Sequence, residues 1–385
     1  MKATKYYDYI IAGAGAAGLS LAYHLLTHPL FSSKKILIID KEDKKINDRT
    51  WCFWERGGGL FESCVTQEWS KLKFASPEWE AIVTAEPYRY KMIESHNFYK
   101  FCWNKIHQFP NVDIVKTQIT SIESGVVRCV DSIYQGEIIF NSALFKIGQS
   151  KKSHHLLQHF KGWYVDFEAP ILDPQVATLM DFDIAQGGDC RFVYVLPISK
   201  HKALVEYTVF SKSLLNDATY EEALGKYISL KFPNQFYQIS HTEYGVIPMT
   251  NATIDNGNVA NKVFAIGTAG YATKASTGYT FPFIQRQCRQ ILKGLENGNL
   301  TADILIPRAK FRFYDAVLLN VLATEKFEGW KIFTRLFKQL PAAVVLKFLN
   351  EESTFTDDLK IMMNADTLSF TRAAIEELPH FLRRK

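Results

Sequence analysis

Residues 9–18 read YIIAGAGAAG, and this stretch decides the fold of the 385-residue chain. Tyr9–Ala12 is a short apolar run typical of a buried strand, and the next six residues match the GxGxxG turn. In such a turn Gly13 permits the tight bend, Gly15 lets a pyrophosphate approach the backbone, and Gly18 lets the next helix pack on the sheet. The stretch therefore predicts a dinucleotide-binding turn that ends at a helix N-terminus with free amide donors.

The residues that follow complete a βαβ unit. A helical pattern runs from Gly13 to Leu26, and a second apolar run, Ile36–Ile39, ends in Asp40. Asp40 lies 22 residues beyond Gly18, where a carboxylate at the end of the second strand can bind ribose hydroxyls. A glycine-rich turn needed only for close packing is the alternative, and the position of Asp40 argues against it.

The composition argues against several classes of protein. Lys and Arg exceed Asp and Glu by only 5 charges, without a block of like charge, so nucleic acid is not an expected partner. The six cysteines form no CxxC pair, so we expect neither a metal site nor a disulfide framework. Three histidines match no ligand spacing and are expected at the surface: His154, His155 and His241. Because no apolar run reaches about 18 residues and the N-terminus lacks a signal-peptide pattern, we expect a cytoplasmic protein, soluble or on a membrane surface.

A later strand favours FAD over NAD(P) as the dinucleotide. Val263–Ile266 is apolar, and with Gly267, Thr268 and Gly270 it resembles the second FAD motif of the large flavoprotein families. In those families the strand delivers a Gly-Asp pair to the ribityl chain. Thr268 stands here where Asp is usual, and its hydroxyl can still hydrogen-bond the ribityl oxygens.

The strand and helix patterns divide the chain into four parts. We expect residues 1–160 to form the first part of an FAD-binding domain with an irregular insertion, and residues 246–300 to return to that domain. Between them, residues 161–245 show short alternating strands, which predict an antiparallel sheet as the floor of a substrate domain. Residues 301–385 are expected to form a C-terminal helical region.

Five short motifs in the same order resemble those of one family, the flavin-dependent lycopene cyclases of bacteria, cyanobacteria and plants. They are Asp48–Trp54, Met180–Phe182, Leu204–Thr208, Gly245–Met249 and Thr277–Tyr279. The resemblance implies an α/β, Rossmann-type FAD-binding fold of the p-hydroxybenzoate hydroxylase-like (PHBH-like) flavoproteins, with an antiparallel β-sheet substrate domain and C-terminal helices. It also implies an isomerase that closes the acyclic ends of lycopene to β-ionone rings, giving β-carotene via γ-carotene without net redox change.

The implied chemistry depends on Glu206 in the third motif. Cyclization starts with protonation of an alkene, a very weak base, so the acid must be a carboxyl that burial keeps protonated near neutral pH. Strand alternation places Glu206 on one face with Leu204 and Thr208. Tyr207, which stands where the family motif commonly has a second acid, points to the other face. A solvent-facing carboxylate on an edge strand is the alternative, and the apolar residues on both faces argue against it.

The resemblance assigns further residues to the flavin and to proton transfer. Reduced FAD, with NADPH as the expected reductant, would stabilise the passing carbocation electrostatically. Gly278 is expected to let the backbone approach the flavin ring. Asp181 is expected to orient the flavin or a loop and is the second candidate for proton donor, with a capping role as the alternative.

Four aromatic residues are candidates for contact with the substrate: Trp51, Phe53, Trp54 and Tyr279. Their rings are expected either to stabilise a carbocation by cation–π contact or to belong to the core.

The C-terminal region suggests how an insoluble hydrocarbon reaches the protein. Residues 308–350 contain eight Lys or Arg against three acids, interleaved with aromatic residues. Basic amphipathic helices of this kind bind anionic lipid, so we expect peripheral attachment to the inner membrane. A helical lid packed on the protein is the alternative.

Two other functions are compatible with the motifs. An FAD-dependent hydroxylase or a geranylgeranyl reductase of the same fold would consume NADPH in proportion to product, whereas a cyclase needs only catalytic amounts of reduced flavin. A flavin- or lipid-binding protein without turnover is the third reading, and the acid expected in an apolar strand argues against it.

Overall fold

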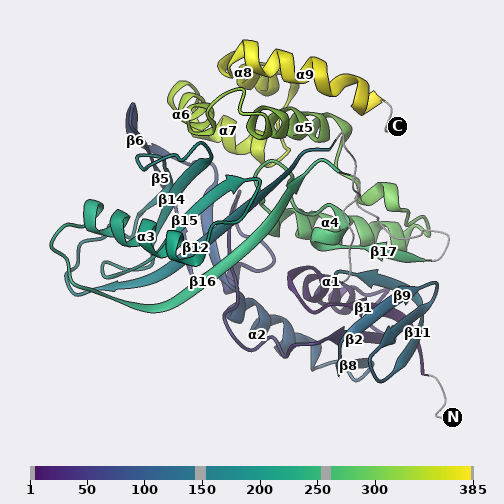
Figure 1. The fold of residues 1–385 in the computed structure, drawn as a ribbon. Coiled ribbons are helices and arrows are strands. Elements are labelled where there is room, and N and C mark those ends of the chain that lie inside the picture. Colours follow the sequence, from purple (N-terminus) through teal and green to yellow (C-terminus); the bar gives the residue numbers. More distant parts are fainter. Residues whose placement is uncertain (1–4, 144–152, 253–261, 383–385) are drawn as a thin grey trace.

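The computed structural model describes residues 5–143, 153–252 and 262–382. Within these ranges the strands form two seven-stranded sheets and one three-stranded sheet. The C-terminal helices lie over the second sheet, on the side away from the first (Figure 1). The fold is a mixed α/β architecture, which confirms the predicted class.

The first sheet contains the glycine turn. Its strand order is β8-β2-β1-β11-β10-β9, with β17 beside β11. The strands are β1 (Tyr6–Ala12), β2 (Ile36–Asp40), β8 (Val112–Lys116), β9 (Ile119–Glu123), β10 (Val126–Cys129), β11 (Ile133–Asn141) and β17 (Val263–Ala265). β17 pairs in parallel with β11, although residues 155–250, which form five strands of the second sheet, come between them in the chain. Two helices pack together on this sheet, α1 (Ala16–Thr27) and α4 (Phe281–Glu296), where Gln285 donates a hydrogen bond to Ser20.

The second sheet has the order β16-β12-β15-β14-β13-β5-β6. Its strands are β5 (Lys71–Ser76), β6 (Trp79–Thr84), β12 (His155–Phe167), β13 (Val176–Asp181), β14 (Cys190–Pro197), β15 (Lys202–Ser211) and β16 (Tyr237–Thr250). All neighbouring strands are antiparallel except β13 and β5, which are parallel. β5 and β6 belong to the early insertion, whereas the other five strands come from residues 155–250. The expected boundaries at residues 160 and 245 fall inside β12 and β16, two long strands that each contribute residues to both expected parts. Helix α3 (Asp217–Lys231) covers one face.

A small sheet of β3 (Thr50–Glu55), β7 (Arg89–Glu94) and β4 (Gln67–Trp69) completes the strands. Helix α2 (Ser95–Ile106) follows β7 directly. At its first turn, the Ser95 hydroxyl accepts hydrogen bonds from the backbone amides of Asp48 and Arg49. This contact fixes the start of β3, which enters the site described below.

The C-terminal helices pack on the second sheet through aromatic side chains. They are α5 (Ala309–Ala323), α6 (Gly329–Gln339), α7 (Ala342–Leu349), α8 (Phe355–Asn364) and α9 (Thr367–Leu382). Phe337 on α6 stacks on Phe74 of β5 with ring centroids 3.8 Å apart, and Phe311 and Phe333 are also buried. Among the described residues, no helix is long and apolar enough to cross a bilayer.

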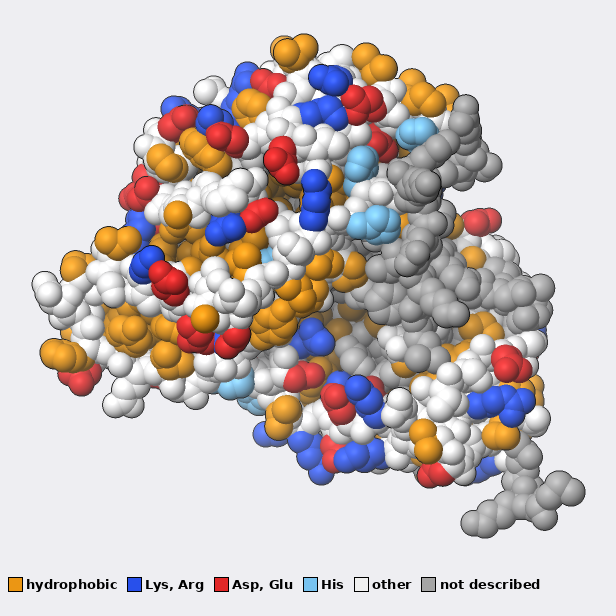
Figure 2. Space-filling model, viewed as in Figure 1, with side chains coloured by type: hydrophobic (Ala, Val, Ile, Leu, Met, Phe, Trp, Pro, Cys, Tyr) orange, Lys and Arg blue, Asp and Glu red, His pale blue; other side chains and the backbone are white. Residues whose placement is uncertain are grey.

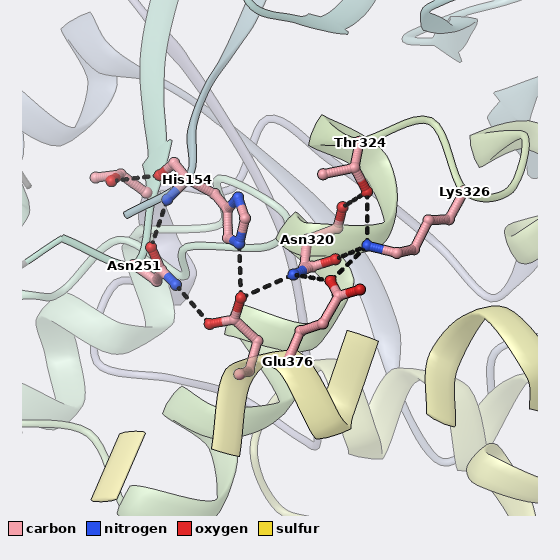
Figure 3. A network of polar contacts seen from close by, with 8 residues as sticks. His154, Asn251, Asn320, Thr324, Lys326 and Glu376 are labelled. Carbon is pink, nitrogen blue, oxygen red and sulfur yellow. Dashed lines mark hydrogen bonds and ion pairs between the residues drawn. The ribbon is translucent and has the colours of Figure 1, made fainter. Parts of the chain in front are cut away.

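A polar network joins α9 to the start of β12 (Figure 3). His154 lies 2.7 Å from a carboxylate oxygen of Glu377, and Asn320 on α5 donates to the same oxygen. Lys326 extends the network to Glu376 and Asn320. The expectation that His154 is a surface residue is therefore wrong, because its ring is mostly buried against this carboxylate.

Glu377→Gln is expected to lower the free energy of unfolding at pH 7 by about 1–3 kcal/mol, since a neutral amide replaces a carboxylate that accepts several hydrogen bonds. Burial raises the pKa of Glu377, but the hydrogen bonds from His154 and Asn320 outweigh burial, so its pKa is lowered. A carboxyl with a lowered folded-state pKa stabilises the protein above its unfolded pKa and loses this contribution as the pH falls. In urea titrations the difference between wild type and variant should thus vanish below about pH 4. Glu222→Gln on α3, an exposed ion pair, is the control with a change near zero; equal stability of wild type and Glu377→Gln at pH 7 would contradict the prediction.

Candidate active site

A cavity of about 620 Å³ lies where the three sheets meet, and residues of all three sheets line it. Gly13, Gly15 and Asp40 line it from the first sheet, and Glu206 and Glu243 line it from the second. The residues expected to bind a dinucleotide and the residue expected to donate a proton therefore share one cavity.

The three glycines of the turn have different surroundings. Gly13 has φ +103°, and a Cβ there would overlap Ser142 Oγ. A Cβ on Gly18 would overlap the carbonyl oxygen of Gly13, so this glycine is required for the helix to approach the strand. A Cβ on Gly15 would meet no atom within 4 Å, so Gly15 faces open space at the N-terminus of α1. That space, beside free amide donors, is suited to a pyrophosphate.

Asp40 fixes the same turn at the end of β2. Its Oδ2 accepts a hydrogen bond of 2.6 Å from the amide of Ala14, and its Oδ1 accepts one of 2.9 Å from Glu42. The carboxylate also lines the cavity, where it is available to ribose hydroxyls.

Polar groups without partners lie in the part of the cavity formed by β12 and the loop before α4. Gln158 and Thr277 line the cavity, and their Oε1 and Oγ1 atoms are buried without a hydrogen-bond partner in the described part of the chain. Gly278 has φ +73°, and a Cβ there would overlap Gln158 Oε1. Buried polar atoms normally have partners, so these atoms fit a ligand with hydrogen-bonding edges, such as a flavin ring.

The other residues of the second FAD motif lie in a short 3₁₀ turn, η3 (Gly267–Gly270), after β17. The Gly267 amide donates to Gln287 Oε1 over 2.8 Å, and the Thr268 hydroxyl pairs with that of Thr273 over 3.0 Å. Gly267 and Thr268 both line the cavity. The loop that follows is held by a buried charge cluster: Lys274 donates to Asp315 over 2.7 Å and to Glu351 over 3.2 Å.

Glu206 and Glu243 approach each other across β12. Gly162 pairs with Glu206 on β15 and with Glu243 on β16, so the two carboxyls stand on the same face, on either side of a glycine. Their side chains extend toward each other over Gly162, close enough for the two carboxyls to interact. Thr208 donates to Glu206 over 2.9 Å, and Thr50 on β3 donates to Glu243 over 2.6 Å.

Burial raises the pKa of Glu206 well above the ordinary range, and the negative charge of Glu243 raises it further. Burial also raises the pKa of Glu243, while the hydrogen bond from Thr50 and the contact with Glu206 oppose this effect. Two carboxyls in contact cannot both ionise at low cost, so the pair retains one proton near neutral pH. The pKa of Glu206 is raised the more strongly of the two, which favours Glu206 as the member that keeps the proton.

The four aromatic candidates do not all reach the cavity. Trp51 and Tyr279 line it, whereas Phe53 and Trp54 are buried behind them. Trp54 packs edge-on against Tyr279 with centroids 4.4 Å apart, and its indole donates to the carbonyl of Leu346. Phe53 stacks in the core beneath the small sheet and supports no direct contact with a ligand.

Asp181 lies outside the cavity. Its carboxylate accepts a hydrogen bond of 2.8 Å from Tyr227 on α3 and lies 3.3 Å from Lys231. It also accepts a hydrogen bond from the amide of Asp183. The carboxylate thus joins β13 to α3, and this position away from the cavity does not suit a proton donor; Asp181 ends a strand and caps no helix of the described chain.

Glu243 is a residue of the candidate site that the sequence analysis did not single out. It lies two positions before Gly245 in one of the five motifs, in a strand where alternate residues share a face, and that spacing was a usable signal. The sequence does not show that Gly162 stands between Glu243 and Glu206, because strand register across 80 residues is not encoded locally.

Comparisons with solved structures identify the fold. A geranylgeranyl bacteriochlorophyll reductase-like protein from Thermoplasma acidophilum superposes with TM-score 0.56 and 14% identity, covering 99% of this chain and 98% of its own. The flavin-dependent monooxygenase PieE, solved with FAD and substrate, gives TM-score 0.56 and 13% identity over 94% and 73%. The flavin-dependent brominase Bmp2 gives 0.55 and 12% over 99% and 100%. The fold is thus the PHBH-like fold of FAD-dependent monooxygenases and reductases.

The sequence identifies the family to which the chain belongs within this fold. The model of the family described as lycopene cyclase protein matches residues 8–375. The chain therefore belongs to the lycopene cyclase family. A comparison with curated proteins gives no match.

Proposed function

We propose that the protein is a lycopene β-cyclase that forms β-ionone rings by proton transfer, without net redox change. One observation carries the proposal: the Glu206 carboxyl faces the same cavity as the dinucleotide turn, and its raised pKa keeps it protonated. An alkene accepts a proton only from such an acid, whereas hydride transfer does not require one.

FAD is the cofactor that the cavity fits. The turn at Gly15 would hold the pyrophosphate, Asp40 the ribose, and Thr268 the ribityl chain, with Gln158 and Gly278 beside the ring. When bound in its reduced state, the flavin supplies an electron-rich surface that stabilises positive charge electrostatically. NADPH is the proposed source of the reducing electrons.

The protein side chains perform the acid–base steps. Glu206 donates its proton to the terminal double bond of lycopene, and the cation closes the ring by attack of a neighbouring double bond. A ring proton then returns to the Glu206 carboxylate, which regenerates the acid. Trp51 and Tyr279 line the cavity and are placed for cation–π contact with the charged ring.

An anaerobic incubation with dithionite-reduced FAD and lycopene, followed by chromatography of the pigments, tests the proposal. A cyclase forms γ- and β-carotene without NADPH consumption. A hydroxylase or a reductase, the alternatives that share this fold, would consume NADPH in proportion to product. Recovery of unchanged lycopene, both with dithionite-reduced FAD and with FAD and NADPH, would contradict any catalytic role with this substrate.

We further propose that the protein docks on anionic membranes through α8 and α9 rather than through residues 308–350, whose large aromatics Phe311, Phe333 and Phe337 are buried. The exposed apolar side chains lie on the last two helices: Phe355, Leu359, Met362, Met363, Leu368, Ile375, Leu378 and Leu382. Figure 2 shows hydrophobic side chains along the upper edge of the molecule, where Figure 1 places these helices.

The charges around this apolar surface fit an anionic lipid. The acids of α8 and α9 are held in ion pairs within the protein, as with Asp358 and Lys310 or Glu376 and Lys326. Lys360 is exposed, Arg372 is exposed and pairs with Glu376, and the sequence continues with Arg383-Arg384-Lys385. An apolar helical face bordered by basic residues is typical of peripheral membrane attachment.

Replacing Leu368 and Ile375 together with Ser is expected to weaken binding to phosphatidylglycerol vesicles about tenfold or more, since each apolar side chain contributes roughly 1 kcal/mol or more on leaving water. Both side chains are more than half exposed, so the fold should be unaffected. Vesicle cosedimentation at low and high salt measures the effect. Leu230→Ser, an equally exposed apolar site on α3, is the matched control; equal binding by the double variant and wild type would overturn the assignment.

A further inference from the structure

The contact between Glu206 and Glu243 has a feature that a single buried acid lacks. β15 and β16 lie on either side of β12, so the Cα atoms of Glu206 and Glu243 are about 10 Å apart. Only the extended side chains of the two residues bring the carboxyls together. Gly162 makes the contact possible, because a Cβ there would lie 2.9 Å from Leu204 Cδ1, 3.0 Å from Glu243 Cγ and 3.4 Å from its Oε1. The sheet is thus built so that the two carboxyls meet.

The surroundings give the two carboxyls different roles. Glu243 is 7% exposed and accepts a hydrogen bond from Thr50, whose hydroxyl is itself 2.8 Å from that of Tyr164. Glu206 is more accessible from the cavity and accepts from Thr208. The hydrogen bond to Glu243 is the shorter one, 2.6 Å against 2.9 Å, and the charge of His241 also opposes the rise in the pKa of Glu243, so the ionised form is favoured at Glu243 and the proton stays on Glu206.

Building on the proposed cyclase activity, we propose that Glu243 is a positioning residue whose negative charge holds the catalytic proton on Glu206 and drives its recovery after ring closure. Before reaction the pair carries one proton and one negative charge. When the Glu206 O–H bond breaks and a C–H bond forms on the terminal alkene carbon, the pair carries two negative charges and the substrate one positive charge.

The same arrangement closes the cycle. Repulsion between the two adjacent carboxylates makes Glu206 a strong base at the moment when the ring cation must lose a proton. The ring C–H bond breaks, its electrons form the ring double bond, and the proton returns to Glu206. Protons and charge balance without a further reactant, so the pair is ready for the second end of the substrate.

The titrating groups around the pair favour this charge state. Those facing Glu206 and Glu243 from the surrounding elements are Cys52 and Glu94 on β3 and β7, Tyr90 on β7, Tyr164 on β12, Tyr194 on β14, His241 on β16 and Tyr279 in the loop. Burial raises the pKa of Cys52, Tyr90 and Tyr194, which keeps them neutral. The negative charge that faces Glu206 directly is therefore that of Glu243.

Glu243→Gln tests the inference through the pH profile. Removing the negative charge lowers the pKa of Glu206, so the alkaline loss of cyclization should move to lower pH, with kcat reduced about tenfold or more and KM for lycopene unchanged. Thr208→Val is the matched control, because it removes a hydrogen bond that lowers the pKa of Glu206. In this variant the alkaline loss of activity should therefore move to higher pH. Glu243→Asp keeps the negative charge, so the pH at which its activity is lost should lie nearer to that of wild type. An unshifted profile in Glu243→Gln would overturn the proposal.

A spectroscopic measurement separates this inference from the proposed function. The infrared C=O band of the protonated carboxyl, assigned by its loss in Glu206→Gln, can be titrated in the protein without substrate. The band should disappear at lower pH in Glu243→Gln and in Gly162→Ala than in wild type. If the wild-type protein forms no carotene but the band shifts as expected, the proposed function fails and the pair stands; an unshifted band refutes the pair whatever the activity.

Discussion

Glu206→Gln is expected to reduce cyclization on the order of a hundredfold or more, the usual scale for removing a general acid. The amide retains the size of the side chain but has no acidic proton for the alkene. Flavin binding should be unchanged, because no atom of Glu206 belongs to the turn at Gly15 or to Asp40. Pigment analysis after anaerobic incubation gives the activity, and flavin absorbance of the same sample gives the occupancy.

Two further variants make this result specific. Glu206→Asp should retain traces of activity, since the shorter carboxyl still carries a proton but from a displaced position. Glu80→Gln, on β6 of the same sheet and exposed, should behave as wild type. A Glu206→Gln protein that forms β-carotene at a rate near that of wild type would remove this residue from the mechanism.

Gly15→Val is expected to abolish flavin binding while leaving the fold intact. The side chain would enter the space intended for the pyrophosphate, yet a Cβ at this position meets no protein atom within 4 Å. Circular dichroism and thermal unfolding of the flavin-free protein should therefore match wild type, whereas absorbance after reconstitution with FAD should show no bound flavin.

The neighbouring glycine provides the contrast. Gly18→Val would place atoms against the carbonyl of Gly13 and should destabilise the flavin-free fold itself. Gly225→Val on α3, where a Cβ also has open space, should preserve both fold and flavin. Full occupancy in Gly15→Val would show that the dinucleotide lies elsewhere.

Much of the fold could be predicted because its signals are local. The strand, the glycine turn and Asp40 lie within 32 residues and specify the βαβ unit of the first sheet. The alternation around Glu206 likewise placed Tyr207 on the opposite face, where it packs with the core beneath α3. Such patterns depend on neighbours in sequence, so they can be read without the structure.

The parts that escaped prediction depend on contacts between distant segments. Glu243 acquires its role only through the register of β12 between two other strands. Asp181 belongs to one of the five family motifs, but the residues that contact it, Tyr227 and Lys231, lie on a helix about 50 residues later in the chain. The motif alone therefore does not show what Asp181 contacts. The aromatic residues of α5 and α6 have the composition of a membrane surface, but packing against the rest of the protein buries Phe311, Phe333 and Phe337.

The buried cluster around Lys274 has a consequence for the fate of the protein. Burial lowers the pKa of this lysine, but the charges of Asp315 and Glu351 outweigh burial and keep it charged. If the loop moved away from the helices, Lys274 and its two carboxylate partners would lose their ion pairs. Any ligand that orders the loop thereby adds its binding free energy to the stability of the helical layer, by mass action. Chains that lack flavin should be the ones that proteases remove first, which makes cofactor supply a determinant of how much protein accumulates.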